Sequence, residues 1–305
     1  MTQLRISLFG KFHCAIDSEF ISGIGGRKAQ VLLSYLALSP VKMHHRDVLC
    51  AALWDDRSEL QARKGLRQAL WLLQSALPAN GSQHEYIIVD GDWIGLNRQA
   101  DVWIDANVLE TTYGRFHNVP EVVFGPAEAE QTWAAVLLYK GDLLEGNYYD
   151  WCIHERERFQ FMYLSLLDRL LGYYELNGDY ENGLNCGMRI LRHDRAREST
   201  HRRLIRLHYA SGHRTRALHQ YAMCVAALRE ELGVEPGKST QHLYAQICDD
   251  QRGEGAQPLT LPVAPSPENS TLALSDSMSD LLHIRRLIDL LRQQVDYVIA
   301  SMQQA

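Results

Sequence analysis

Residues 59–77 read ELQARKGLRQALWLLQSAL, a stretch with three cations and no acidic residue after Glu59. Apolar side chains recur along it at steps of three and four, which predicts an amphipathic helix over residues 58–77. Ser58 and Gln61 fit a capping box, in which two side chains satisfy free amides of the first turn. The opposite face of the helix is polar and basic. The expected buried stripe is Leu66, Ala69, Leu70, Leu73 and Leu77.

The segments before this helix predict two strands and two further helices. LRISLFG (4–10) alternates apolar and polar residues as a half-buried strand does, and KFHCAI (11–16) follows as its hairpin partner. RKAQVLLSYLALSP (27–40) has helical spacing and ends at a proline. HRDVLCAALW (45–54) predicts a second short amphipathic helix. Its expected buried side is Val48, Leu49, Ala52 and Leu53.

The segment after the basic helix predicts a β-hairpin. EYIIVDGDWIGLN (85–97) holds two β-rich runs around Asp90–Gly91, a strong hairpin signal. Two strands, three helices and a hairpin, in this order, describe a winged helix-turn-helix. His44–His45 precedes the second helix and is interpreted as a solvated loop.

Residues 126–250 have an almost purely helical pattern that contains an internal repeat. ELNGDYENGLNCGMRIL (175–191) and YASGHRTRALHQYAMCVAAL (209–228) align at an offset of 34 residues, the period of the tetratricopeptide helix pair. The offset aligns Gly178 with Gly212, Leu184 with Leu218 and Leu170 with Leu204. Because repeats do not stand alone, we expect residues 126–175 to supply a preceding helix pair. GVEPGKSTQHLYAQI (233–247) would add a terminal capping helix.

The C-terminal part changes character twice. Residues 251–275 hold four prolines and few large apolar groups, which is typical of a flexible linker. Residues 276–305 then show an unbroken heptad pattern, which predicts an amphipathic helix. That helix is either a coiled-coil or docking element used for oligomerisation, or a terminal helix that packs on its own chain. Its apolar seam is Leu281, Ile284, Ile288, Leu291, Val295, Val298 and Met302.

The expected fold class is therefore mainly α, with a small α+β part at the N-terminus. Residues 1–104 would form the winged helix, 105–250 an all-α repeat domain resembling tetratricopeptide repeats, 251–275 the linker and 276–305 the coiled-coil-like helix.

Composition and motifs exclude several classes of function. The net charge is -6, so any nucleic-acid binding must depend on local charge. The six cysteines are scattered without a CxxC pair, which favours reduced structural thiols. No phosphate-binding loop, HExxH, GxSxG or metal-ligand spacing occurs, so we expect no enzyme, cofactor or metal. Without a signal peptide or a run of about 18 apolar residues, we expect a cytoplasmic protein that does not enter a membrane.

The basic helix favours DNA as the partner. A helix enters the major groove when one face packs on its domain and the other offers donors to phosphates and bases. Arg67 is the best candidate for a bidentate contact to guanine, and Arg63 and Lys64 suit phosphate or base contact. Alone, the same residues would also fit an ordinary solvated helix face. The predicted DNA-binding residues are Arg27, Lys28, Arg46, Arg63, Lys64, Arg67, Gln68, Trp71, Gln74 and Arg98.

Two stretches resemble a known family. The run from RKAQVLLSYLALSP to LRQALWLLQSAL resembles the OmpR-type winged helix of bacterial regulators. YKGDLLEG, the GDY turn and ELGVEP resemble the bacterial transcriptional activator domain. The pairing is similar to the antibiotic-regulatory-protein (SARP) family over roughly residues 3–250. The chain departs from the family pattern at LLQ (72–74), at Asp90 and Asp92 in the wing, and at Asp194–Arg195.

The resemblance implies a transcriptional activator that occupies tandem sites in double-stranded promoter DNA and recruits RNA polymerase. It also implies a homo-oligomer, most simply a dimer, with regulation through the repeat domain. The alternative hypothesis is a protein-interaction adaptor whose winged helix no longer binds DNA strongly. A protein or small-molecule effector at the repeat domain is a third option. Four tyrosines would either line its groove or belong to the repeat core: Tyr173, Tyr174, Tyr209 and Tyr221.

Overall fold

The computed structural model describes residues 3–17, 19–21, 24–39, 43–77, 86–97, 99–119 and 123–250. Residues 1–252 form one compact unit. Several sequence predictions lie outside the described residues. They are the helix stop at Pro40, the contact at Arg98, the linker 251–275 and the helix 276–305 with its apolar seam.

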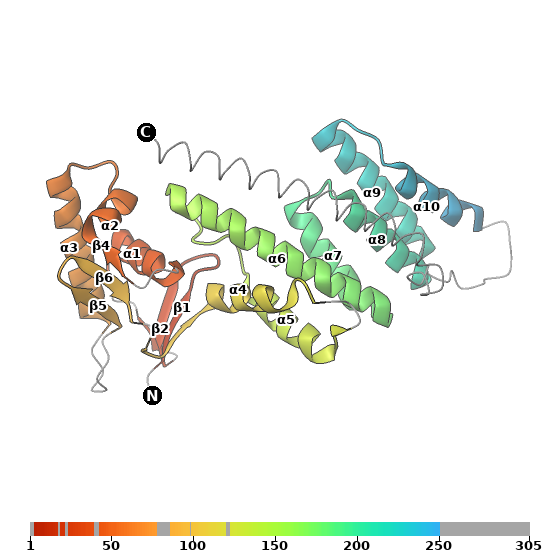
Figure 1. Ribbon diagram of the computed structural model, residues 1–305. Coiled ribbons are helices and arrows are strands. Elements are labelled where there is room, and N and C mark those ends of the chain that lie inside the picture. The colour runs from red at the N-terminus through yellow and green to blue at the C-terminus, as the bar shows by residue number, and fades with distance from the viewer. Residues whose placement is uncertain are drawn as a thin grey trace, which may run out of the picture. The chain divides into compact units, whose positions relative to one another are not determined.

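A four-stranded sheet begins the chain and brings together its first strands and a much later one (Figure 1). The strands are β1 (Leu4–Ser7), β2 (His13–Ile16), β3 (Glu19–Phe20) and β7 (Val102–Ile104), in the order β3-β2-β1-β7. β1 pairs antiparallel with β2, as the predicted hairpin requires, and parallel with β7. Leu4 and Ile6 are fully buried while Arg5 is exposed, so the alternation seen in the sequence is realised.

Three helices and a hairpin follow, which confirms the winged helix-turn-helix. The helices are α1 (Arg27–Leu38), α2 (Arg46–Leu53) and α3 (Glu59–Ala76). Strands β5 (Ile87–Asp90) and β6 (Trp93–Leu96) form the wing, with Gly91 at φ 56° in its turn. A two-residue strand, β4 (His44–His45), extends this sheet in the order β4-β6-β5. All five residues of the predicted α3 stripe are buried.

Three local predictions are wrong. His44 is not in a solvated loop, because β4 pairs with β6 and the imidazole packs on Tyr35 at 5.2 Å between ring centroids. Val48 is half exposed, because α2 buries Leu49, Cys50 and Leu53 instead. Ser58 precedes α3 but its side chain makes no capping bond. The first turn of α3 is at the surface, where water can satisfy its amides.

The remaining helices form the repeat part. They are α4 (Asp105–Phe116), α5 (Pro126–Leu138), α6 (Asp150–Asn177), α7 (Tyr180–His193), α8 (Glu198–Ala210), α9 (Arg214–Leu232) and α10 (Lys238–Asp249). Gly178 and Gly212 have φ of 70° and 79° in the turns after α6 and α8, which confirms the aligned repeat glycines. α10 packs on α8 and α9, as predicted for the capping helix.

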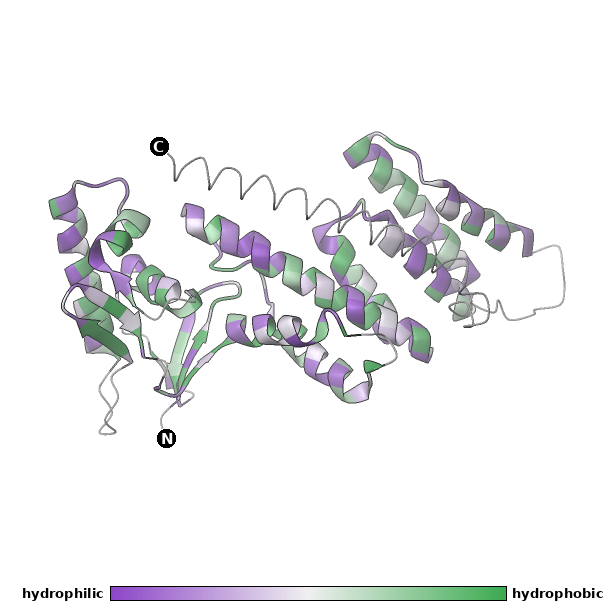
Figure 2. Cartoon of the chain, in the orientation of Figure 1, coloured by the Kyte–Doolittle hydropathy of each residue, from purple (hydrophilic) through white to green (hydrophobic). Residues whose placement is uncertain are grey.

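The helix pair before the repeats differs from the prediction. α6 is itself the first helix of a repeat, so the preceding pair is α4 and α5, and residues 126–175 supply only half of it. The α6–α10 helices are banded with apolar and polar residues, as helices with one packed face are (Figure 2). The four tyrosines predicted for groove or core pack partly buried against the core.

The cysteines are unpaired, and five of the six are buried. Burial raises the pKa of Cys14, Cys152 and Cys186 to about 12, so these thiols stay protonated at neutral pH. They act as small apolar groups of the core.

Candidate nucleic-acid interface

α3 packs unusually closely against the residue that ends α2. A Cβ atom built on Gly65 would lie 2.5 Å from Nε1 of Trp54, the residue that ends α2. Only a glycine allows the indole to lie against the backbone of α3. The contact fixes the angle between the two helices of the helix-turn-helix and leaves the opposite face of α3 toward solvent.

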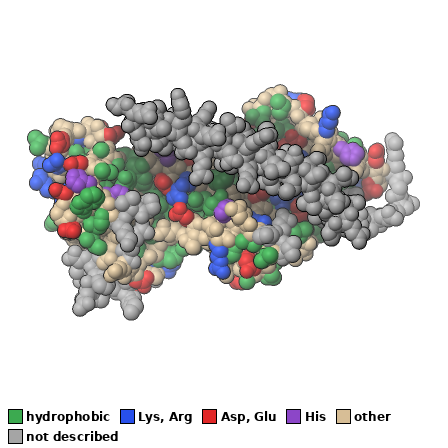
Figure 3. Space-filling model, in the orientation of Figure 1, with side chains coloured by type: hydrophobic (Ala, Val, Ile, Leu, Met, Phe, Trp, Pro, Cys, Tyr) green, Lys and Arg blue, Asp and Glu red, His purple; other side chains and the backbone are tan. Residues whose placement is uncertain are grey.

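The outward face of α3 carries every residue predicted for it. All six side chains are exposed, and Trp71 has 65% of its surface accessible. In Figure 3, the end of the molecule that holds α3 shows Lys and Arg side chains with acidic and His side chains beside them. The six exposed residues are Arg63, Lys64, Arg67, Gln68, Trp71 and Gln74.

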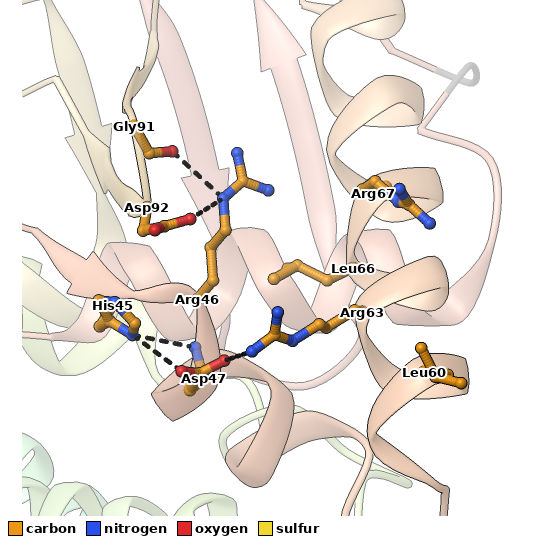
Figure 4. Close-up of a pocket in the computed structure, with 9 residues that line it drawn as sticks. All are labelled: His45, Arg46, Asp47, Leu60, Arg63, Leu66, Arg67, Gly91 and Asp92. Carbon is orange, nitrogen blue, oxygen red and sulfur yellow. Dashed lines mark hydrogen bonds and ion pairs between the residues drawn. The ribbon is translucent and has the colours of Figure 1, made fainter.

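A groove of about 630 Å³ lies between the start of α2, the first half of α3 and the wing turn. Figure 4 shows the nine residues that line it. Arg46 donates from Nε to the carbonyl of Gly91 at 3.2 Å and lies 3.5 Å from an oxygen of Asp92. This side chain therefore ties α2 to the wing turn. The lining is His45, Arg46, Asp47, Leu60, Arg63, Leu66, Arg67, Gly91 and Asp92.

Some of the cationic side chains on this surface form ion pairs with carboxylates, and others do not. Arg63 is 3.0 Å from carboxylate oxygens of both Asp47 and Glu59. Within the described part of the chain, Lys64 and Arg67 make no ion pair or hydrogen bond. Two free cations therefore project from the middle of α3, and a third is held beside them by acidic neighbours.

Arg27 and Lys28 are not among the groove residues. Arg27 donates from Nε to Asn147 Oδ1 at 3.1 Å and from its guanidinium to the carbonyl of Gly146. The ammonium group of Lys28 donates to the carbonyl of Leu53 and lies over the ring of Tyr149 at 4.9 Å. Both side chains thereby connect the winged helix to the segment before α6.

The structure adds residues that the sequence analysis did not single out. Trp93, on the wing, is half exposed and its ring lies 5.4 Å from that of His45 in an edge-to-face contact. Asp47 stands between His45 and Arg63. The hairpin signal at Asp90–Gly91 placed Trp93 beside a turn, whereas nothing in the sequence indicated the pairing of Asp47.

Comparison with known proteins agrees with this architecture. Residues 125–248 match the family of the bacterial transcriptional activator domain. The solved structure "Mycobacterium tuberculosis EmbR in complex with low affinity phosphopeptide" is similar, with a TM-score of 0.60 and 16% sequence identity. The match covers 82% of this chain and 66% of that one, slightly under two thirds of its length. No curated protein matches the chain by sequence.

Residues 125–248 are thus a bacterial transcriptional activator domain, preceded by a winged helix-turn-helix. This order of a winged helix-turn-helix followed by the activator domain agrees with the resemblance seen in the motifs of the chain.

Two further observations concern membrane-spanning helices and metal ligands. Among the helices that the structure describes, none has the length and hydrophobicity needed to cross a membrane. The same residues contain no group of three or more His, Cys, Asp or Glu side chains placed to hold a metal ion.

Proposed function

We propose that this regulator binds promoter DNA through α3 and activates transcription. The observation that carries the proposal is the outward face of α3, where Lys64 and Arg67 are exposed and have no partner among the described residues. A charged side chain that is not already paired contacts a phosphate or base without first breaking an ion pair. α3 has 18 residues and so is about 27 Å long, enough to lie along a stretch of major groove.

Each cation has a distinct role in the proposal. Arg67 lies centrally on the exposed face, where its planar fork suits the O6 and N7 acceptors of a guanine. Lys64 is a point charge better suited to a phosphate. Arg46 positions the wing turn through Gly91 and Asp92, so that the wing flanks the same stretch of duplex. Trp71 and Gln74 extend the contact toward the end of α3.

Partner proteins belong to the same proposal. The activator domain supports recruitment of RNA polymerase and assembly of more than one copy on a promoter, as the family resemblance implies. A homo-oligomer would allow two winged helices to occupy neighbouring sites cooperatively. An effector bound to the repeat part would regulate this assembly.

A second candidate function is a protein adaptor with a weak winged helix. It is favoured by the acidic residues of the groove, since Asp47 pairs with Arg63 and Asp92 pairs with Arg46. These pairs lower the positive potential that a phosphate backbone would meet. The adaptor would use its helical repeats and leave α3 solvated.

Binding of the purified chain to labelled promoter DNA of its own gene, across a salt series, separates the two candidates. Random-sequence DNA of equal length measures the non-specific part. Arg67→Glu is expected to weaken specific binding by about 100-fold, because it removes a base contact and adds a repulsive charge. The matched control is Arg192→Glu on α7, another exposed arginine without a partner in the described residues.

The result expected is salt-dependent binding that prefers promoter DNA, that fails for Arg67→Glu and that persists for Arg192→Glu. Equal loss in both variants would assign the effect to net charge alone. Absence of binding even at low salt would favour the adaptor.

A further inference from the structure

A second polar pocket lies in the repeat part, far in sequence from the groove at α3. It has a volume of about 290 Å³ and is bordered by the end of α4, the middle of α6 and the start of α8. Its lining is His117, Ser165, Asp168, Arg169, Gly172, Arg197 and Arg203. Apart from Gly172, every residue of the lining has a polar or charged side chain.

Three guanidinium groups converge on this pocket with a single carboxylate in the lining. Nη1 of Arg203 lies 3.3 Å and Nη2 of Arg197 lies 3.6 Å from the same oxygen of Asp168. Arg203 also donates from Nε to Glu175 at 2.8 Å, outside the lining. One carboxylate does not use all the N–H donors of two arginines. The lining therefore keeps a net positive charge and N–H donors that these carboxylates do not use.

Arg169 supplies the third guanidinium and an unmet hydrogen bond. Its Nη2 donates to the carbonyl of Val119, and its guanidinium lies over the ring of Phe124 at 4.9 Å. Its Nε is buried and has no acceptor among the described residues. Buried N–H groups are almost always paired, and leaving a charged one unpaired is costly. Arg169 therefore adds a positive charge to the lining that no carboxylate among the described residues neutralises.

We propose that this pocket is an anion-binding site that takes the phosphate group of a small phosphorylated compound. Guanidinium forks match the oxygens of phosphate in geometry and in charge. The volume is at the small end for ligand pockets, which leaves room for a phosphate group and a modest substituent. The site lies where α4, α6 and α8 meet, so an occupied pocket joins the helix that follows β7 to the repeats.

The competing interpretation is a purely structural ion-pair network centred on Asp168. The two interpretations differ in what an added anion does. A satisfied network gains nothing from phosphate, whereas an anion site is stabilised by it in a saturable way.

The first experiment titrates the full chain with inorganic phosphate and follows thermal unfolding at constant ionic strength, with chloride as the balancing salt. We expect Tm to rise and saturate. Arg197→Gln is expected to raise the phosphate concentration at half-saturation about tenfold, because it removes a charged hydrogen-bond donor from the pocket. The matched control is Arg195→Gln, two residues away, whose side chain is 63% exposed and pairs with Glu230 and Glu231 outside the pocket.

A rise in Tm that does not saturate, or that is the same in Arg197→Gln and in the wild type, would overturn the proposal. Equal weakening in Arg195→Gln would overturn it as well, because the effect would be one of net charge. Malonate at the same charge tests the ligand class. A stronger response to malonate than to phosphate would assign the pocket to dicarboxylates and contradict our choice of phosphate.

A second pair of variants keeps the test independent of the arginines. Ser165 is half-buried in the lining, and its hydroxyl donates to the carbonyl of Phe161 at 2.8 Å. Ser165→Glu places a carboxylate in the pocket, so we expect a higher Tm without phosphate and no further rise with it. Ser165→Gln has nearly the same size and should still respond to phosphate. If Ser165→Glu still responds as the wild type does, the anion binds elsewhere and the proposal fails.

Discussion

The carboxylate of Asp105, the first residue of α4, accepts the backbone N–H of Leu8 with both oxygens at 2.9 Å. One of these oxygens also accepts the N–H of Phe9 at 3.1 Å. Burial raises the pKa of Asp105, while these amides, together with that of Ala106, oppose the shift. The residue after β7 thus satisfies the amides that follow β1, and it locks the start of the helical part onto the first sheet.

Asp105→Ala should therefore destabilise the whole compact unit. The change leaves buried N–H groups of Leu8 and Phe9 without an acceptor, and we expect a loss of about 3 kcal/mol in the free energy of unfolding. Urea unfolding followed by circular dichroism measures it. Asp101→Ala is a suitable control, because Asp101 is an exposed residue in the same region. Equal losses in the two variants would contradict the role given to Asp105.

The Gly65→Ala variant tests the close contact between α3 and Trp54. In a solvent-exposed helix, alanine is about 1 kcal/mol more favourable than glycine. Here the added Cβ would approach Trp54 to 2.5 Å, so we expect a net loss of about 1–3 kcal/mol instead. Gly114→Ala in α4 is the matched control, since its Cβ would meet nothing within 4 Å. That variant should gain stability, and thermal unfolding of both reveals the opposite signs.

Stability should fall on acidification through His44. Burial lowers the pKa of this imidazole from its ordinary value of 6.5, and its Nε2 has no hydrogen-bond partner among the described residues. The unfolded chain then binds a proton more readily than the folded chain. Stability is therefore full above the unfolded pKa and is lost as the pH falls from about 6.5 toward the lowered folded value, by up to about 1.4 kcal/mol per pH unit for one group.

His44→Phe keeps an aromatic ring against Tyr35 and removes the titration. We expect the slope of Tm against pH between 7.5 and 5.5 to become shallower in this variant. Burial also lowers the pKa of His201 and His208, so part of the slope should remain. His219→Phe replaces an exposed histidine as control. An unchanged slope in His44→Phe would show that His44 does not contribute.

Asp47→Asn should strengthen DNA binding, if α3 is the DNA-binding helix as proposed. The change removes one of the two carboxylates that hold Arg63 at 3.0 Å and frees its guanidinium for a phosphate. We expect several-fold tighter binding and a slope of log K against log salt that is steeper by about 0.9. Glu181→Gln on α7 removes an exposed carboxylate far along the chain and serves as control. Weaker binding by Asp47→Asn would mean that the ion pair orients Arg63 productively.

The sequence predicted the parts of the fold that depend on local periodicity. The stripe from Leu66 to Leu77 and the repeat glycines Gly178 and Gly212 were found because helices and tight turns impose short, regular spacings. Strand β4 has only two residues, which is too few for any alternation to be read. α2 has only two turns, and this left the phase of its buried face open, so that Val48 was placed on the wrong side.

The exposed face of α3 could be predicted from the sequence, but the hydrogen bonds and ion pairs of the candidate site could not. Exposure of Lys64 and Arg67 follows from the position of the apolar stripe on α3. The partners of Arg63, Arg46 and Lys28 depend on contacts between elements that are distant in sequence, such as the wing turn or the segment before α6. Such contacts have no period, and one sequence alone does not reveal them.

The pairing of β1 with β7 has a mechanical meaning. The chain leaves this sheet after β3 at one edge and re-enters it as β7 at the other edge, where Leu4 lies opposite Val102 and Ile6 opposite Ile104. The three helices and the wing lie between β3 and β7 in the chain, so they are joined to the same sheet at both of their ends. A domain joined to its neighbour by one linker can rotate freely. The winged helix is joined to the sheet at both ends, so it can transmit torque. A twist imposed on α4 would therefore reach the helix-turn-helix as a change of orientation.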